Sequence, residues 1–373
     1  MKFLKHLHIL TSLSALWLLA GCSSTSSSSA PTSSVRSYSG TASVGDFLTI
    51  TLNPVAQTIT YTDISNGSGG IIPYTVNSDG TYALNDSTGN LVAAYEVPNY
   101  ALLIQATKSG PTKDQLALVT AVETGTISTA MLANNSYNSM QFRTAAGGLE
   151  VGSIAIDGSA NVNVSSYWPF GAVNQNGGGQ VNLGTFSASL FQTDPSGTFM
   201  KMADDTNNGA YDYVFGTPNG VFVVDTPNGA ILALKKAASA AFDPSFAGAY
   251  KAIYYQKVNA STGAGNVETG TPSLANATFT ITVTGQVTVQ DTQGNTLLQA
   301  ALIPVANVSY LVGTGELQDP CYGLFTFRVT TASSQQDVFV TFLGRAVLFS
   351  SFTAHLPWGS GNSYDYLYGV GLK

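Results

Sequence analysis

Alternation of apolar and polar residues with a period of two runs through most of this chain, and it limits the possible folds more than any other feature. Clear examples are 46–52, 57–62, 277–283 and 323–329, all rich in β-branched and aromatic residues. This pattern is typical of half-buried antiparallel strands, because successive side chains of a strand point to opposite faces. Turn dipeptides separate such segments about every 8–12 residues. The sequence predicts an all-β fold, and only 233–241 has helix-forming composition.

The scarcity of charged residues excludes two other classes of protein. Charged residues make up 9% of the chain, against about 25% in typical globular domains. The exposed faces of a helical bundle need Lys, Glu and Arg, yet Lys and Arg together number 14. The net charge is −7, and no basic cluster is present to neutralise phosphates. We therefore expect neither a helical bundle nor a nucleic-acid partner.

Internal similarity indicates that one β-meander occurs more than once. Segment 82–103 aligns with 211–232, and 338–348 is a weaker third copy. Segment 137–142 likewise resembles 250–255. The same order of strand, turn and strand recurs in the aligned segments, which is typical of internal duplication. If the duplication is real, the hairpins at 92–105 and 221–234 should correspond; otherwise one or two larger sandwiches become the better interpretation.

The repeats divide the chain into three tandem antiparallel β-meander units, at 38–133, 134–245 and 246–373. Each would hold about eight strands, enough to close an up-and-down barrel and remove its sheet edges. In strand count and meander order the units resemble calycin-type barrels. That resemblance implies a cavity suited to an apolar ligand.

The first 22 residues have the pattern of a secretion signal. Lys2 and Lys5 precede an apolar stretch that ends in Leu19-Ala20-Gly21-Cys22. This ending resembles the signal peptide of bacterial lipoproteins. The resemblance implies cleavage after residue 21, acylation of Cys22, and anchoring of the protein in a membrane of the cell envelope. Ser23 in place of Asp implies the outer membrane rather than the inner, and the Ser-rich segment 22–37 is expected to be a flexible tether.

The mature chain offers few residues for catalysis. Acylation of Cys22 would leave Cys321 as the one remaining thiol, which we expect to be a small buried residue beside a turn. His355 is the one histidine outside the signal peptide, and no Gly-x-Ser-x-Gly motif is present. We expect His355 to be an ordinary loop residue and assign no catalytic residue.

One polar turn resembles part of a calcium-binding loop. Asp204, Thr206 and Asn208 match positions 1, 3 and 5 of such a loop, and Asp212 matches position 9. Phe215 stands where the bidentate Glu belongs. A solvated turn is the favoured interpretation, and Ca²⁺ at Asp204, Thr206, Asn208 and Asp212 is the one cofactor hypothesis.

The sequence favours a membrane-anchored, non-enzymatic envelope lipoprotein with a binding, scaffold or surface role. Its partner is an envelope protein, a glycan or an apolar ligand. Two alternatives are a carrier of an apolar molecule in a calycin-like cavity and a secreted hydrolase with two close carboxylates; a transmembrane barrel is the least favoured. Aromatic segments 165–170, 357–358 and 364–368 could bind sugars, rim a pocket or plug a barrel end.

Overall fold

The structure is a computed structural model of the whole chain. It describes residues 34–85, 89–108, 115–143, 149–168, 181–187, 190–203, 209–260, 270–305, 321–355 and 364–373. The described residues all belong to one compact unit, Ser33–Lys373. In this unit nearly all described regular structure is antiparallel β-sheet, as the sequence predicted.

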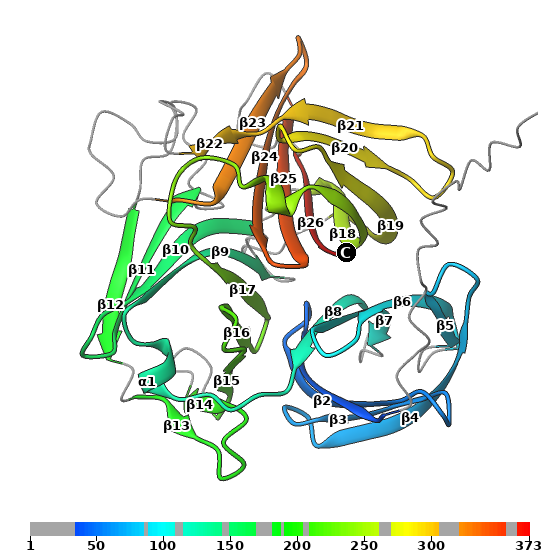
Figure 1. Cartoon of the computed structure of the whole chain (residues 1–373), viewed down its shortest axis with the longest axis vertical. Helices are drawn as coiled ribbons and strands as arrows, with labels where there is room; N and C mark the ends of the chain where they lie inside the picture. Colours follow the sequence, from blue (N-terminus) through cyan, green and yellow to red (C-terminus); the bar gives the residue numbers. More distant parts are fainter. Residues whose placement is uncertain are drawn as a thin grey trace, which may run out of the picture. The chain divides into compact units, whose positions relative to one another are not determined.

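The first eight strands form a closed barrel (Figure 1). They are β1 (Arg36–Ala42), β2 (Asp46–Asn53), β3 (Thr58–Asp63), β4 (Ser68–Val76), β5 (Tyr82–Asn85), β6 (Leu91–Val97), β7 (Ala101–Lys108) and β8 (Gln115–Glu123). Each strand pairs with the next, and β8 pairs back onto β1. Closure leaves this sheet without an edge, so all its strands are protected from pairing with other chains.

A second sheet of nine strands forms a half-barrel. It contains β9 (Asn135–Arg143), β10 (Leu149–Ile156), β11 (Asn161–Trp168), β12 (Val181–Ser187), β13 (Gln192–Thr193), β14 (Met200–Ala203), β15 (Tyr211–Gly216), β16 (Val221–Thr226) and β17 (Gly229–Lys235). The last strand, β17, pairs with the first, β9. The sheet therefore ends at β12 and β13, its fourth and fifth strands in chain order.

The third sheet repeats this arrangement as a nearly closed barrel. Its strands are β18 (Gly248–Ala260), β19 (Thr271–Ile281), β20 (Gln286–Gln290), β21 (Thr296–Ala301), β22 (Ile303–Pro304), β23 (Leu324–Thr330), β24 (Ser334–Leu343), β25 (Ala346–His355) and β26 (Tyr364–Leu372). Strand β26 pairs with β18, and the sheet ends at β21 and β22, again the fourth and fifth strands. The unit boundaries placed at 133/134 and 245/246 remain a prediction.

The two hairpins used to test the repeat both exist but differ in detail. Strands β6 and β7 pair with Val97 opposite Ala101, whereas β16 and β17 pair with Thr226 opposite Gly229. The first turn is longer by one residue and contains Asn99 in the left-handed region, at φ 57°. The register is therefore offset by one residue between the copies. The match between 137–142 and 250–255 falls on β9 and β18, the first strands of their sheets.

Apolar side chains gather both inside and outside the sheets. Separate buried groups line the interiors of the first barrel, the half-barrel and the third sheet. A further group, here called the outer core, joins outer faces of all three sheets. In it Phe47 of β2 stacks on Tyr213 with ring centroids 4.9 Å apart, and Phe142 of β9 meets Tyr255 of β18 at 4.8 Å.

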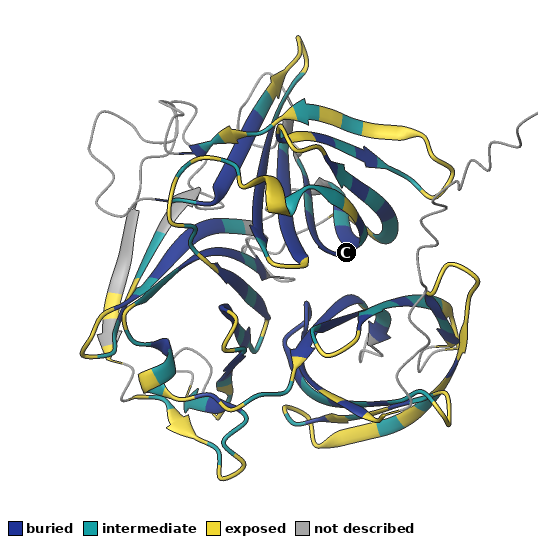
Figure 2. Cartoon of the chain, viewed as in Figure 1, coloured by how far each residue is buried: buried dark blue, intermediate teal, exposed yellow. Residues whose placement is uncertain are grey.

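The outer core changes how individual strands are buried. Strands β8, β16 and β24 are buried on both faces over most of their length, so the expectation of half-buried strands is wrong for them. Strands β3 and β4 fit that expectation, since their outer faces are exposed (Figure 2). The difference arises because β8, β16 and β24 each contact a neighbouring sheet and β3 and β4 face solvent.

Helices contribute little to the described part of the chain. They are α1 (Thr129–Leu132), capped by Ser128, and the 3₁₀ helix η2 (Pro244–Phe246), capped by Asp243. The helix-forming composition of 233–241 was misleading, because β17 continues to Lys235 and no helix follows before η2. No helix among the described residues is long and apolar enough to cross a bilayer.

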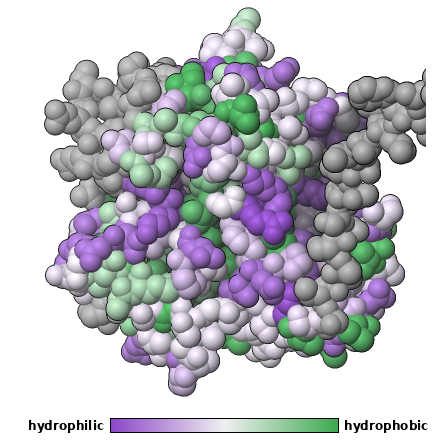
Figure 3. All heavy atoms as spheres, viewed as in Figure 1, coloured by the Kyte–Doolittle hydropathy of each residue, from purple (hydrophilic) through white to green (hydrophobic). Residues whose placement is uncertain are grey.

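Large exposed apolar side chains are scattered over the surface. Val55, Ile71 and Leu91 are the most exposed of them, and they lie in a turn, on β4 and on β6. On the face drawn in Figure 3, hydrophilic and hydrophobic residues are interspersed. Single exposed apolar residues of this kind are normal and mark no particular interface.

Candidate ligand-binding cavity

The interior of the first barrel contains a cavity of about 430 Å³. Its wall follows from the alternation of the strands, since every second residue of β2 points inward. Leu48 and Ile50 of β2 line this space together with Ile59 of the neighbouring strand β3 and Ile104 of β7. The volume falls within the range of about 300–1,000 Å³ that is typical of small-molecule sites.

A buried ion pair lies inside the barrel near one of its ends. Arg36 contacts both carboxylate oxygens of Glu96, at 2.6 and 2.7 Å, and the two side chains are 3% and 1% exposed. The hydroxyls of Tyr38 and Tyr82 each donate to Glu96 at 2.5 Å. Burial and the neighbouring Glu96 raise the pKa of both tyrosines. They therefore stay protonated as donors, and the carboxylate is fully satisfied.

The polar part of the cavity wall contains two aspartates joined by an asparagine. The amide nitrogen Nδ2 of Asn66 donates to Asp46 at 2.6 Å and to Asp63 at 2.8 Å. The backbone N–H of Asn66 also donates to Asp63, at 3.0 Å, which fixes the turn after β3. Both aspartates are buried, at 6% and 7% exposure. This end lies opposite the ion pair, because β1 begins at Arg36 and ends where Ala42 pairs with Asp46.

The cavity therefore has one apolar section and one polar section. Its chemistry suits a molecule with a hydrocarbon body and a polar group at one end. The burial of the Arg36–Glu96 pair leaves a single polar end available for that group. A site of this kind binds mainly through apolar contact and orients its ligand through a few polar atoms.

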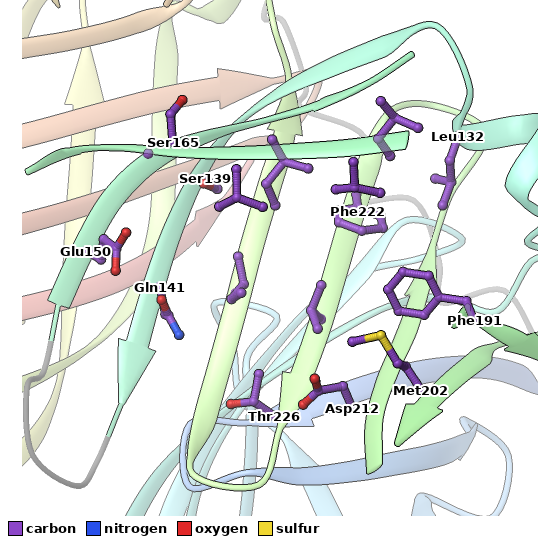
Figure 4. A pocket seen from close by; sticks show the side chains of 17 residues that line it. Leu132, Ser139, Gln141, Glu150, Ser165, Phe191, Met202, Asp212, Phe222 and Thr226 are labelled. Atoms are coloured by element: carbon purple, nitrogen blue, oxygen red, sulfur yellow. The ribbon is translucent and has the colours of Figure 1, made fainter. Parts of the chain in front are cut away.

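A second, smaller cavity of about 280 Å³ lies on the inner face of the half-barrel. Figure 4 shows Asp212 of β15 beside Thr226 of β16 at one end, with Leu132 and Phe222 toward another. Glu150 and Gln141 add polar groups to its wall.

A buried aspartate lies where the first barrel meets the half-barrel. Asp225 of β16 is 1% exposed and accepts a short hydrogen bond from the hydroxyl of Thr41 on β1. Burial raises the pKa of Asp225 well above its ordinary value, and the charges of Asp46, Asp212 and Asp63 raise it further. Three other carboxylates therefore lie near enough to act on Asp225.

The structure describes only part of the hypothetical calcium loop. Asp204, Thr206 and Asn208 lie outside the described residues, as does Cys22. Asp212 is described and lines the half-barrel cavity. Within the described residues, no group of three His, Cys, Asp or Glu side chains could hold a metal ion. The calcium hypothesis stays a prediction.

Four other residues from motifs singled out in the sequence lie on strands or in the core. Cys321 is 1% exposed and belongs to the outer core, so the prediction of a buried apolar role is confirmed. His355 is the last residue of β25, where its backbone pairs with that of Ser334. Tyr366 and Tyr368 are not loop residues but lie on β26 in the outer core, which overturns their expected place at a pocket rim or barrel end.

Sequence reasoning missed the aspartates of the cavity. Asp46 stands at the start of an apolar strand, on the same face as Leu48, Ile50 and Leu52. This alternation is visible in the sequence, so it could have indicated that a carboxylate lies inside the barrel. The partnership with Asp63 depends on strand pairing and was not visible.

Comparison with known proteins gives little. No protein-family model matches the chain, and no curated protein matches it. Among solved structures, it is similar to transferrin binding protein B from Haemophilus parasuis at 7% identity and a TM-score of 0.22, covering 91% of this chain and 76% of that one. The same protein from Neisseria meningitidis is similar at 10% identity and a TM-score of 0.22, covering 88% and 66%.

Proposed function

We propose that this chain is a membrane-anchored, non-enzymatic lipoprotein of the bacterial outer membrane that binds an apolar small molecule inside its first barrel. The observation that supports this most directly is the cavity of about 430 Å³, walled by aliphatic residues of a closed barrel. The motif ending in Cys22 supports the lipid anchor.

The position of the cavity also favours ligand binding over a purely structural role. A barrel of eight strands is small enough for side chains to fill its interior completely. Here the large side chains Tyr38, Tyr74 and Tyr82 lie in the barrel core but are absent from the cavity wall, although Tyr61 belongs to it. Among the larger aliphatic residues of the wall are three small ones, Ala42, Ala106 and Ala117, which leave space unfilled. Unfilled apolar space lowers stability, so its presence favours a function for it.

The test is to block the cavity without disturbing the fold. Ala106, a partly buried wall residue, is replaced by Phe, and exposed Thr60 on the outer face of β3 is replaced by Phe as the matched control. We expect native mass spectrometry to detect a bound apolar molecule, either retained from cells or added as dodecanol, in the wild type and Thr60→Phe. Occupancy should fall at least about tenfold in Ala106→Phe. Equal occupancy in both variants, or none in the wild type, would contradict the proposal.

A carboxylate-dependent hydrolase is the second candidate function. Asp46 and Asp63 accept hydrogen bonds from the same nitrogen of Asn66, at 2.6 and 2.8 Å, so the two carboxylates lie close together. Glycosidases also use two carboxyl groups that lie close together, about 5–5.5 Å apart in the retaining enzymes. Release of nitrophenol from a panel of aryl glycosides distinguishes the two functions. Turnover by the wild type that disappears in Asp46→Asn would establish the hydrolase and overturn the non-enzymatic proposal.

A further inference from the structure

We infer that a polar hollow between the first barrel and the third sheet is a further ligand site, and that its ligand is an uncharged carbohydrate. The hollow has a volume of about 340 Å³, within the range of about 300–1,000 Å³ that is typical of small-molecule sites. None of the described residues in its wall belongs to the wall of the cavity inside the first barrel. The inference therefore goes beyond the proposed function and does not depend on it.

The hollow begins where the outer core ends. On the outer face of β18, Ile253 belongs to the outer core, and Leu274 of β19 packs against it. Further along the same faces, Lys251 of β18 and Asn276 and Thr278 of β19 line the hollow. These residues share a face with Ile253 and Leu274 because every second side chain of a strand points the same way. The two strands therefore change from apolar to polar along one surface.

Strand pairing gathers polar side chains on the third sheet, and the first barrel adds others from its own side. Thr278 pairs with Lys251 on β18 and with Gln290 on β20, so the three side chains form one row. The first barrel contributes Asp79, from the turn between β4 and β5, and Tyr95 of β6. The hollow thus has polar walls supplied by two sheets.

Two contacts hold these walls together. Nε2 of Gln105 on β7 donates to Oδ1 of Asn276 on β19 at 2.8 Å. Nζ of Lys251 lies 3.1 Å from Oδ2 of Asp79 and also donates to the backbone carbonyl of Asp79. A site whose walls are already in place loses less conformational freedom when a ligand binds.

The charged side chains of the described wall are already bonded within the protein. Asp79 is paired with Lys251. Asp291 accepts hydrogen bonds from the backbone N–H groups of Gln293 and Asn295 and from Nδ2 of Asn295. A charged ligand would compete with these contacts, whereas an uncharged ligand would leave them intact. The arrangement therefore favours an uncharged ligand.

Neutral groups of the wall retain hydrogen-bonding capacity for such a ligand. Within the part of the chain that the structure describes, the hydroxyls of Tyr95, Thr278 and Thr292 have no hydrogen-bond partner. Asn276 uses its carbonyl oxygen but neither of its amide hydrogens, and Gln290 uses its Nε2 but not its Oε1. Hydroxyl and amide groups supply both donors and acceptors, which match the hydroxyl groups of a sugar. Tyr95 also packs against the outer core, so it adds an aromatic ring for apolar contact with the C–H groups of a sugar.

The test measures the binding of four neutral disaccharides, namely maltose, cellobiose, lactose and diacetylchitobiose, to residues 22–373 carrying Cys22→Ser. Saturation-transfer NMR detects binding, and titration gives the dissociation constant. We expect at least one of the four to bind. Cellobiouronate, which is cellobiose with one added carboxylate, should bind no more tightly than cellobiose. Binding of none of the four would overturn the inference, and tighter binding of cellobiouronate than of cellobiose would overturn the uncharged class of ligand.

Two variants and one control locate the site. Thr278→Val and Tyr95→Phe each remove one hydroxyl with little change of shape. Each should raise the dissociation constant of the tightest-binding disaccharide about 2- to 10-fold, the range of one hydrogen bond. Thr280→Val is the matched control and should change nothing, because Thr280 lies on the same face of β19 but outside the described wall. Weakening by either variant and not by the control would support the site; no weakening by either, or equal weakening by the control, would overturn it.

Discussion

Single residues of this protein show how burial decides what a carboxylate does. Asp157 is exposed, and hydrogen bonds from Asn161 and Ser159 lower its pKa, which is the ordinary state of an aspartate that organises a turn. Asp225 is buried, and that burial raises its pKa. The same side chain therefore favours ionisation in one place and resists it in the other.

This contrast predicts opposite effects of pH at the two sites. Because the folded-state pKa of Asp225 is raised, its contribution to stability is complete below the unfolded pKa of about 3.9 and is lost as pH rises through the folded pKa. Asp225→Asn keeps an acceptor for Thr41 without the charge. We expect it to increase the free energy of unfolding by at least about 1 kcal/mol at pH 8 and to have little effect at pH 4.

Denaturant unfolding of both proteins from pH 4 to pH 8 checks this, with Asp157→Asn as the opposing control. The pKa of Asp157 is lowered, so its stabilisation is present above the unfolded pKa and lost as pH falls through the folded pKa. Asp157→Asn should therefore lower the free energy of unfolding at neutral pH. Parallel stability curves for the wild type and Asp225→Asn would contradict the interpretation of Asp225.

At the scale of elements, one tight turn of the first barrel packs closely against the half-barrel and another does not. The turn between β1 and β2 contains Gly45 at φ 86°, and the turn between β3 and β4 contains Gly67 at φ 66°. Both are conformations that favour glycine. A Cβ atom on Gly45 would overlap the backbone of Pro227 in the β16–β17 turn, whereas a Cβ atom on Gly67 would meet nothing within 4 Å. Gly45 is therefore needed for conformation and for contact.

Replacing each glycine by alanine separates these two requirements. Gly67→Ala should cost about 1–2 kcal/mol, from the left-handed conformation alone. Gly45→Ala should cost about 1–3 kcal/mol more, because backbone atoms of the neighbouring sheet must move. Thermal unfolding of both variants measures the difference. Equal losses of stability in the two variants would contradict the close approach of the Gly45 turn to the backbone of Pro227.

At the scale of the whole molecule, three sheets share the outer core although each also has an interior of its own. Sheets that pack through their outer faces bury strands on both sides, and such strands read as continuous apolar runs. This arrangement leaves the interiors free for other uses. The interior of the first barrel contains a cavity and a buried ion pair. The interior of the third sheet is packed with aromatic rings, such as those of Phe279 and Phe349, whose centroids lie 5.2 Å apart.

The attachment of this molecule to its membrane is predicted to depend on one thiol. Cys22→Ser should abolish acylation and move the protein from the membrane fraction to the soluble fraction, because several acyl chains supply most of the membrane affinity. Cys321→Ser is the matched control and should stay in the membrane fraction, since that thiol is buried in the outer core. Mass measurement of the N-terminal peptide and fractionation of cells report the outcome. Membrane association that survives Cys22→Ser would contradict the lipid anchor.

The sequence by itself determined the class of fold, because alternation and turn dipeptides are local properties that each strand carries alone. It placed β2, β3 and β23, the last part of β19 and both test hairpins for that reason. Local patterns could not show which faces meet. The burial of Tyr366 and Tyr368, the one-residue offset at Asn99 and the meeting of Asp46 with Asp63 were decided by the tertiary structure, since each depends on strands that pairing and packing bring together.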